Sequence, residues 1–325
     1  MPRAVPPAAS SLAIEFGAVS AGAVHEPVGP GLRLPIPLLA GEAAEKIFDG
    51  VHPAGEKEGF RLFRRGGLLL GCALEPARPD LAGQTQRLYQ RLIALSRDRH
   101  LYRIWNYVPR INAHVAGLEN YHAFCRGRSL AFEEALGPAF KQALPAASAV
   151  GGDDHHLAVV FAAGSAGPRH IENPEQTPAY EYPREHGPRP PSFARATVVE
   201  EDGRRYAFIS GTSAVKGHAT VAPGALREQL ACTLDNLRLI SRAIGLDDTF
   251  GAEKSFARHF KIYLRQAEDL DAVRAALEAA LLQPGDRVTY LRADICRAAL
   301  NLEIEAALVS RTSNAQHPTS KPGLD

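Results

Sequence analysis

The chain has 325 residues, 45% of them hydrophobic, and its 37 lysines and arginines nearly balance its 36 aspartates and glutamates. This length predicts two domains of about 150 residues, and the balanced charge gives no general attraction for nucleic acid or an anionic membrane. The four cysteines lie far apart and form no CxxC pair, so neither a disulfide framework nor a zinc knuckle is indicated. With no signal-peptide pattern and no apolar run of about 20 residues, we expect a cytoplasmic protein.

In chain order, residues 1–30 are rich in Pro, Ala and Gly and are expected to be irregular. One pattern of strands and helices then occurs twice, over residues 31–170 and 197–310. Each copy has strand-like apolar and aromatic runs, a helix, a strand, a second helix and closing strands. Residues 311–325 are polar with two prolines, and a disordered tail is expected there.

The helices are predicted from the spacing of apolar residues. In the second copy Leu230, Leu234, Leu237 and Ile240 recur at steps of three and four, which forms one apolar face. Gly245 follows as a C-terminal capping glycine. Together with the strands, such helices predict an α+β fold: two tandem domains, each a mixed sheet with its helices on one face.

Between the two copies lies a segment that neither copy explains, residues 171–196. Its six prolines exclude a regular helix or a central strand. Composition alone is typical of a linker. The segment also contains, however, the aromatic, amide and guanidinium groups that bind a carboxylate, and prolines keep such a loop rigid at little entropic cost. We therefore predict a substrate-binding loop at the domain interface, with these polar and aromatic residues: Gln176, Tyr180, Tyr182, Arg184 and Arg195.

The two copies differ at their closing strand. In the second copy, Glu303 and Glu305 alternate with apolar Leu302 and Ile304, so the two acids share one face of a strand. In the first copy an apolar residue, Val159 or Val160, falls near the place of Glu303. A carboxylate present in one copy only indicates a single active site. Alternation by itself does not decide which of the two acids is buried.

The second copy resembles the RidA (YjgF) family, on a serine-glycine pair in a strand, a helix with Gln and Asn-Leu, and a closing EIEA strand. The matching residues are Ser210-Gly211, Gln229, Asn236-Leu237 and Glu303 to Ala306. RidA proteins are trimers with ligand sites between subunits. The resemblance implies two RidA-like domains here in a pseudo-trimer-like arrangement, which the first 60 residues and the proline loop would complete, and we expect a monomer.

From about residue 60 to 308 the chain resembles the chorismatases more closely. The motifs that carry this resemblance are YRIWNYVPRIN, ENYHAFCRGR, LPAASAVG, ENPEQTPAYEYP, GPRPPSFARA, SGTSAVKGH and ICRAALNLEIE. Chorismatases join two RidA-like units and convert chorismate, without a cofactor, to pyruvate and either hydroxybenzoate or a dihydroxy-cyclohexadiene acid. The resemblance therefore implies an enzyme whose partner is the small molecule chorismate.

Releasing pyruvate from chorismate requires protonation of the enolpyruvyl methylene carbon. The proton donor must be a carboxylic acid that stays protonated near neutral pH, which burial in an apolar strand can achieve. The family match selects Glu303 for this role. It also implies that the two substrate carboxylates are bound by Tyr121, Arg128, Tyr182 and Arg195, with Arg297 as a further candidate.

The product depends on the step after protonation: attack by water gives a dihydrodiol acid, whereas attack by the ring hydroxyl leads to hydroxybenzoate. In the family, a cysteine seven residues before the acid and small residues after the SGT turn accompany the aromatising branch. Cys296 stands at that spacing, and Ser213-Ala214 occupy the turn. Because glycine is expected there in a dedicated 3-hydroxybenzoate former, the prediction is 3-hydroxybenzoate, 4-hydroxybenzoate or both.

Two rival functions stay open at this stage, a RidA-like enamine or imine hydrolase and a non-catalytic binding module. RidA enzymes pair their strand glutamate with an upstream arginine, and here Val288 holds that position, beside Arg287. The proline loop argues against both rivals. The run of acids and histidines at residues 153–156 lies in a turn whose adjacent side chains diverge, so no metal site is predicted.

Overall fold

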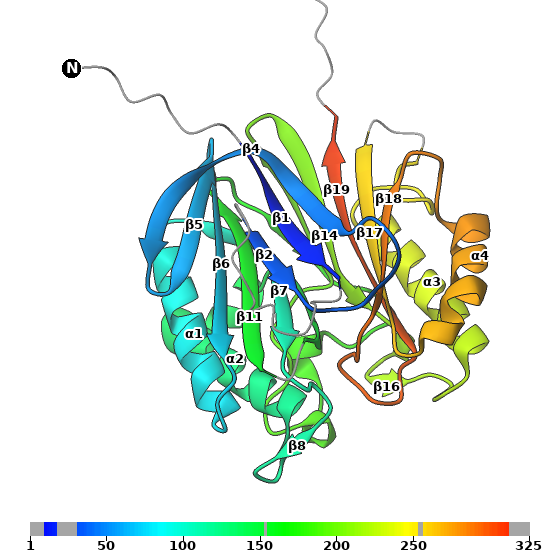
Figure 1. The fold of residues 1–325 in the computed structure, drawn as a ribbon, viewed down its shortest axis with the longest axis horizontal. Coiled ribbons are helices and arrows are strands. Elements are labelled where there is room, and N and C mark those ends of the chain that lie inside the picture. The colour runs from blue at the N-terminus through cyan, green and yellow to red at the C-terminus, as the bar shows by residue number, and fades with distance from the viewer. Residues whose placement is uncertain (1–9, 18–30, 153–154, 253–255, 312–325) are drawn as a thin grey trace, which may run out of the picture.

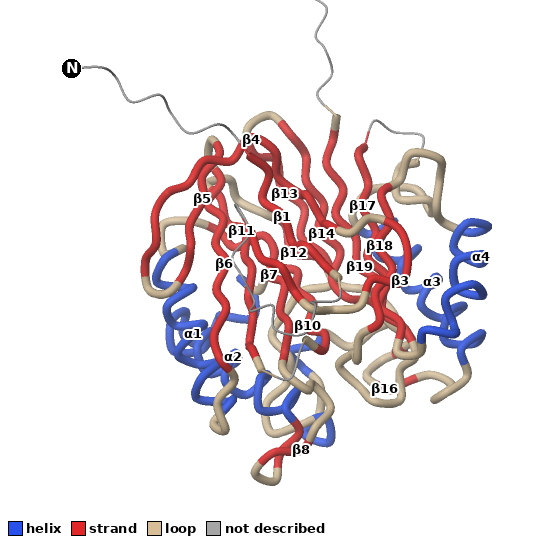
Figure 2. Tube along the Cα trace, in the orientation of Figure 1, coloured by secondary structure: helices blue, strands red, loops and turns tan. Residues whose placement is uncertain are grey.

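The computed structural model describes residues 10–17, 31–152, 155–252 and 256–311. Within these residues, two β-sheets pack against each other at the centre and helices cover their outer sides (Figure 1). Figure 2 shows the same separation, with the strands inside and two pairs of helices on opposite flanks. The predicted α+β pseudo-repeat is confirmed. None of the helices in the described part of the chain has the length and apolarity that a membrane crossing requires.

The first sheet has eight strands in the order β10-β7-β11-β6-β5-β4-β1-β2. The bounds are β1 Ser10–Phe16, β2 Gly31–Leu34, β4 Ala44–Lys57, β5 Phe60–Arg65, β6 Leu68–Pro76, β7 His100–Val108, β10 Ala146–Gly151 and β11 His156–Gly164. Its helices are α1 Leu81–Leu95 and α2 Asn120–Leu136, with a hairpin of β8 His114–Val115 and β9 Leu118–Glu119 and a 3-10 helix η1 Gly137–Ala143.

The second sheet has seven strands in the order β12-β13-β14-β19-β17-β18-β3. The bounds are β3 Leu38–Gly41, β12 Arg169–Ile171, β13 Ala196–Glu201, β14 Arg204–Thr212, β17 Phe256–Leu264, β18 Arg287–Arg292 and β19 Leu302–Ser310. Its helices are α3 Leu226–Ala243 and α4 Leu270–Ala280. The smaller elements are 3-10 helices η2 Ala179–Glu181, η3 Arg184–His186 and η4 Ala267–Asp269, and the hairpin of β15 Val215–Lys216 and β16 Ala219–Thr220.

The predicted spacing of α3 is confirmed. Leu230, Leu234, Leu237 and Ile240 are buried in the core between this helix and the second sheet. At the C-terminus, Gly245 has φ +79° and its amide donates to the carbonyl of Arg242 at 2.9 Å, while the amide of Leu246 donates to Ser241. These two hydrogen bonds around a glycine in the left-handed conformation form a Schellman cap.

The prediction that residues 1–30 are irregular is wrong for β1. Leu12, Ile14 and Phe16 alternate toward the core, and the strand pairs with β4 and β2. The prediction rested on the Pro, Ala and Gly content of the whole segment, which does not reveal an alternation of apolar residues this short. The predicted first domain, residues 31–170, includes β3, but this strand pairs with β18 and so belongs to the second sheet. The other parts of the predicted irregular segment, and the tail from residue 312, lie outside the described residues.

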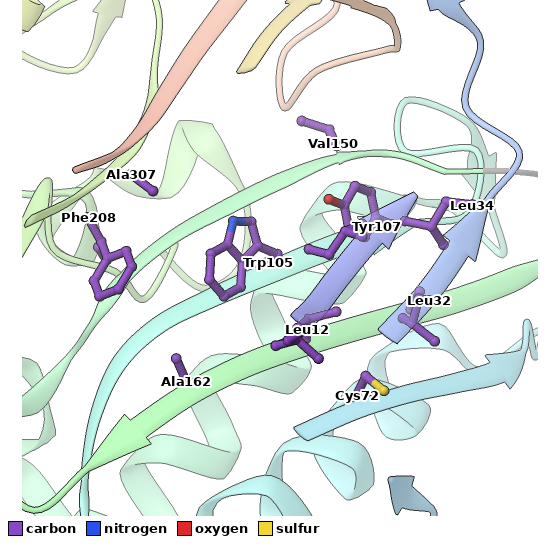
Figure 3. Close-up of a cluster of buried hydrophobic side chains, with 14 of the residues drawn as sticks. Leu12, Leu32, Leu34, Cys72, Trp105, Tyr107, Val150, Ala162, Phe208 and Ala307 are labelled. Atoms are coloured by element: carbon purple, nitrogen blue, oxygen red, sulfur yellow. The ribbon is translucent and has the colours of Figure 1, made fainter. Parts of the chain in front are cut away.

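A third hydrophobic core lies between the two sheets, in addition to one core beneath each helix pair. Figure 3 shows Trp105 and Tyr107 of β7 within it, with Phe208 and Ala307 contributed by the second sheet. The rings of Trp105 and Tyr107 are each only 1% exposed, so they pack between the two sheets. The inter-sheet core fixes the two domains against each other, which a site shared between them requires.

Candidate active site

A cavity of about 430 Å³ lies between the two domains and takes its walls from both. Helix α2 and strand β10 supply one side, the proline loop a second, and β14, β19 and the turn before β19 the third. The predicted site residues found in its wall are Tyr121, Arg128, Gln176, Tyr182, Arg195, Ser213, Cys296, Arg297 and Glu303. The tertiary structure thus collects residues that lie up to 182 positions apart (303 − 121).

Three residues predicted for the site lie outside the cavity wall: Tyr180, Ala214 and Arg184, which is exposed on η3. Tyr180 packs on the core of the first domain, with the ammonium of Lys141 5.9 Å from its ring centre. Helix η2 turns the chain between Tyr180 and Tyr182, so the two rings diverge. Ala214 is fully buried in the inter-sheet core, because it points away from the side that Ser213 presents to the cavity.

Helix α3 positions two loops of the wall through its buried amide side chains. The Nδ2 of Asn236 donates to the carbonyls of Ser213 and Val215 at 3.0 and 2.9 Å. The Nε2 of Gln229 donates to Ala299 at 2.8 Å, while its Oε1 accepts from the amide of Asn301 at 2.8 Å. The Gln and Asn that carry the family resemblance therefore hold the cavity backbone in place.

Glu303 is 3% exposed and stands on β19 opposite Tyr263 of β17. Its side chain occupies space that only glycine at position 211 leaves free, since a Cβ there would lie 2.0 Å from Oε1. Oε1 has no hydrogen-bond partner among the described residues. The other oxygen, Oε2, lies 3.9 Å from the Sγ of Cys296.

Burial raises the pKa of Glu303 to about 8, and the nearby negative charge of Glu305 adds to the effect. The carboxyl group is therefore mostly protonated at neutral pH. Burial, with Glu303 as a second cause, also raises the pKa of Cys296 to about 12, so this residue is a thiol and not a thiolate nucleophile. The pair can supply a proton at the cavity wall.

Glu305, two residues further along β19, has the opposite environment. Its carboxylate receives the ammonium of Lys261 at 2.6 Å and the guanidinium of Arg103 at 2.7 Å. Burial alone would raise its pKa, but the charges of Lys261 and Arg103 outweigh burial and hold it below the ordinary value. Lys261 also pairs with Glu45 of β4, and Arg103 donates to Ser148 of the cavity wall at 2.9 Å.

Arg128 is the cation of the first domain that faces the cavity. It is 1% exposed, its guanidinium lies 4.9 Å from the ring centre of Phe124, and its Nε and Nη2 have no hydrogen-bond partner among the described residues. A buried guanidinium with free donors is costly. An anionic ligand in the cavity would satisfy them.

Two more guanidinium groups lie around Tyr182. Arg195 donates through Nη2 to the hydroxyl of Tyr182 at 2.8 Å and to the carbonyl of Thr177 at 3.1 Å. Its Nε makes no hydrogen bond in the described part of the chain and lies 3.9 Å from the carboxylate of Glu172. Arg297 lies 5.2 Å from the ring centre of Tyr182 and donates to the carbonyl of His218 at 2.8 Å. The cavity thus combines a protonated acid with three cations, which suits a substrate that carries two negative charges.

Sequence reasoning missed several residues of the wall: Glu119, His122, Ser148, Glu185, His186 and Phe193. Three of them, Glu119, His122 and Ser148, lie inside motifs that carried the family resemblance, so the motifs could have pointed to them. For Glu185 and His186, the signal was their place in the predicted binding loop. Of the acids and histidines for which a metal was considered, Asp153 and Asp154 lie outside the described residues.

The geometry agrees with comparisons against known proteins. The family model described as chorismatase FkbO/Hyg5-like, N-terminal, matches residues 48–163. A Streptomyces hygroscopicus protein named 3-hydroxybenzoate synthase is 34% identical over 275 residues, which cover 81% of this chain and 80% of that protein. A second protein of that organism, named chorismatase, is 37% identical over 280 residues, 81% and 79% of the two chains.

A solved structure agrees as well. A chorismatase crystal structure superposes with a TM-score of 0.77 at 30% identity, covering 92% of this chain and 93% of that one. The chain belongs to the chorismatase family, and it is an enzyme.

Proposed function

We propose that this enzyme converts chorismate to pyruvate and hydroxybenzoate, with Glu303 as the proton donor. The observation that carries the proposal is the pair of environments on β19. Glu303 is buried, unpaired and raised in pKa at the cavity wall, whereas Glu305 is neutralised by Lys261 and Arg103. A carboxylic acid held protonated near neutral pH is what the first step needs.

The reaction begins when the carboxyl group of Glu303 donates its proton to the terminal methylene carbon of the enolpyruvyl group. An oxocarbenium ion forms at the ether carbon, and Glu303 becomes a carboxylate. Arg128, Arg195 and Arg297 bind the two substrate carboxylates and keep the methylene carbon near the acid. The ring hydroxyl adds to the oxocarbenium carbon, one ring C–O bond then breaks, and pyruvate leaves with that oxygen as its ketone oxygen. The oxygen that stays on the ring ends as the hydroxyl group, and the ring proton lost on aromatisation balances the proton that Glu303 delivered.

Cys296 supports the aromatising branch. Its thiol stands 3.9 Å from Glu303 and lines the cavity. Because the thiol is uncharged, it contributes a small apolar surface with a weak donor. Such a surface favours attack by the ring hydroxyl over attack by water. The alternative product is the dihydrodiol acid, which hydrolysis would give together with pyruvate.

The position of Arg287 argues against an enamine or imine hydrolase of the RidA type. In the sheet register Arg287 stands beside His259, whereas Glu303 stands beside Tyr263, four residues further along β17. At about 3.3 Å per residue the two positions are roughly 13 Å apart along the strand. The guanidinium of Arg287 instead donates to the carbonyls of Lys46 and Ala44.

Purified enzyme incubated with chorismate tests the proposal. Pyruvate is followed with a coupled dehydrogenase, and aromatic products are separated by chromatography. Equal amounts of pyruvate and hydroxybenzoate are the expected result. Pyruvate with only the non-aromatic diol acid would keep the substrate and refute the product, and no pyruvate would refute the function. A monomeric, cytoplasmic enzyme that needs no cofactor stays a prediction from the sequence.

A further inference from the structure

Three potential metal ligands come together at the wall of the cavity, from segments that the sequence keeps apart. Glu185 and His186 belong to the proline loop, and His218 lies in the turn between β15 and β16. The Nε2 of His186 lies 3.0 Å from the Nδ1 of His218. One carboxylate oxygen of Glu185, Oε1, lies 3.5 Å from the first of these nitrogens and 3.4 Å from the second.

Two of these three distances fit the edges of a zinc tetrahedron, and the 3.0 Å between the two histidine nitrogens is slightly shorter. Zinc binds histidine nitrogen and carboxylate oxygen at about 2.0–2.2 Å, so two ligand atoms of a tetrahedral site lie about 3.3–3.6 Å apart. The two histidine nitrogens share a hydrogen bond here, and a bound ion would replace it. Two imidazoles and one carboxylate also form a recurrent ligand set for this ion.

The charges around the three ligand atoms are mixed. The carboxylate of Glu185 attracts a cation, whereas the guanidinium of Arg297, which donates to the carbonyl of His218 at 2.8 Å, opposes one. Glu185 is exposed, so an ion can reach the group from solvent.

The site would tie together two parts of the cavity wall that already touch at one end. The amide of Thr177 donates to the carbonyl of Gly217 at 3.0 Å, and the amide of Gly217 donates to the carbonyl of Glu175 at 2.9 Å. Further along both segments, Glu185 and His186 of the loop contact His218 of the hairpin. An ion there would add a second connection between the proline loop and the hairpin.

We propose that Glu185, His186 and His218 form a binding site for Zn²⁺ or a similar divalent transition-metal ion, which clamps the proline loop onto the β15–β16 hairpin. The chorismate reaction proposed above contains no step that uses the ion. The sequence predicted no metal because the three ligands are not spaced as a motif. Only the fold brings His218 to the other two.

Zinc binding to the chelator-treated full-length chain tests the proposal. Calorimetric titration with Zn²⁺ should give one site per chain, and Co²⁺ should give the intense visible absorption of four-coordinate cobalt. His218→Ala and Glu185→Gln should each weaken Zn²⁺ binding at least about tenfold, because even loss of an outer-shell partner commonly costs 10- to 100-fold. Exposed His114, in the β8–β9 hairpin, offers the matched control, and His114→Ala should bind as the wild type does.

Hydrogen exchange supplies a readout that does not depend on the affinity. Zn²⁺ should slow amide exchange in residues 182–190 and 215–220 of the wild type and leave both segments unchanged in His218→Ala. The proposal is overturned if the wild type binds no Zn²⁺, or if both ligand variants bind it as tightly as the His114→Ala control. If one variant fails to fold, the other decides the question, since the two substitutions lie in different segments.

Discussion

Strand β19 carries two acidic side chains on one face, and the charged groups around them differ. At Glu305 a buried charge is compensated: Lys261 and Arg103 both pair with it. At Glu303, two residues away, no cation is in contact and one oxygen lacks a partner among the described residues. The two residues are equally inaccessible, at 3% and 1% exposure. Burial acts to raise the pKa of both residues, and the neighbouring cations decide why only Glu305 stays ionised.

The same contrast separates the two domains. Along β11 the residues that face the inter-sheet core are Ala158, Val160 and Ala162, and Tyr107 of β7 stands opposite Ala158. Along β19, Tyr263 of β17 stands opposite Glu303. Strand β11 of the first copy therefore presents only apolar residues to this core, whereas β19 of the second carries Glu303 and the ion-paired Glu305.

The largest expected effect is that of Glu303→Gln on activity. The amide keeps the shape of the side chain but cannot deliver a proton, so pyruvate release from chorismate should fall about 10²- to 10⁴-fold, the usual contribution of a general acid. Steady-state kinetics measures this, with Glu305→Gln as the matched variant on the same strand. A Glu303→Gln enzyme within a few-fold of the wild-type rate would remove Glu303 from the mechanism.

For the free energy of unfolding the order of the two variants should be reversed, with the larger loss in Glu305→Gln. Glu305→Gln leaves Arg103 without its carboxylate and Lys261 with Glu45 alone. Loss of one partner of a buried ion pair typically costs about 3–5 kcal/mol in the free energy of unfolding. Glu303→Gln replaces an uncharged group and should cost far less. Urea unfolding monitored by circular dichroism compares them. Equal losses in the two variants would show that the ion pairs around Glu305 are not what distinguishes the two sites.

The pH dependence of activity should follow Glu303. Its protonated form is the active one, so kcat/KM for pyruvate release should be level below about pH 7 and fall about tenfold per unit above pH 8. In Glu305→Gln the midpoint should move down, because the charge of Glu305 helps to raise the pKa of Glu303. A profile that is flat up to pH 10 would contradict a raised pKa at this position.

The pH dependence of stability has opposite signs at the two acids. Glu303 has a folded-state pKa above its ordinary value of 4.5, so its contribution to stability is complete below that value and is lost as the pH rises through about 8. Glu305 has a lowered pKa, so its contribution is present above 4.5 and is lost as the pH falls through its folded-state pKa. Urea unfolding at several pH values, with the two Gln variants, separates the contributions.

The smallest effect is expected for Cys296→Ala. Pyruvate release should stay within about tenfold of the wild type, since a proton transfer normally contributes more than that, while the ratio of hydroxybenzoate to diol acid should fall. Cys232→Ala, at a buried cysteine outside the cavity wall, should leave the ratio unchanged. An unchanged ratio in Cys296→Ala would leave the thiol with a packing role only.

The sequence determined the local elements and most of the site. The spacing of leucines predicted α3 with its capping glycine, and apolar runs predicted β5, β6, β7 and β19, because these signals are local and repeat along the chain. Most of the predicted site residues lie in the cavity wall, but the prediction missed others, such as Ser148 and His186, and wrongly included Tyr180 and Ala214. Those two failed because the turn at η2 and the alternation after β14 send adjacent side chains in different directions.

Only the tertiary structure decided how the two glutamates differ. Alternation placed both on one face, but Lys261, Arg103 and Glu45 come from β17, β7 and β4, and nothing local in the sequence assigns these charges to Glu305 and not to Glu303. The same holds for β3, which joins the second sheet from the N-terminal segment, and for His218, which meets Glu185 and His186. A pKa and a ligand set depend on distances across the fold, and those are fixed by packing between segments that the sequence keeps far apart.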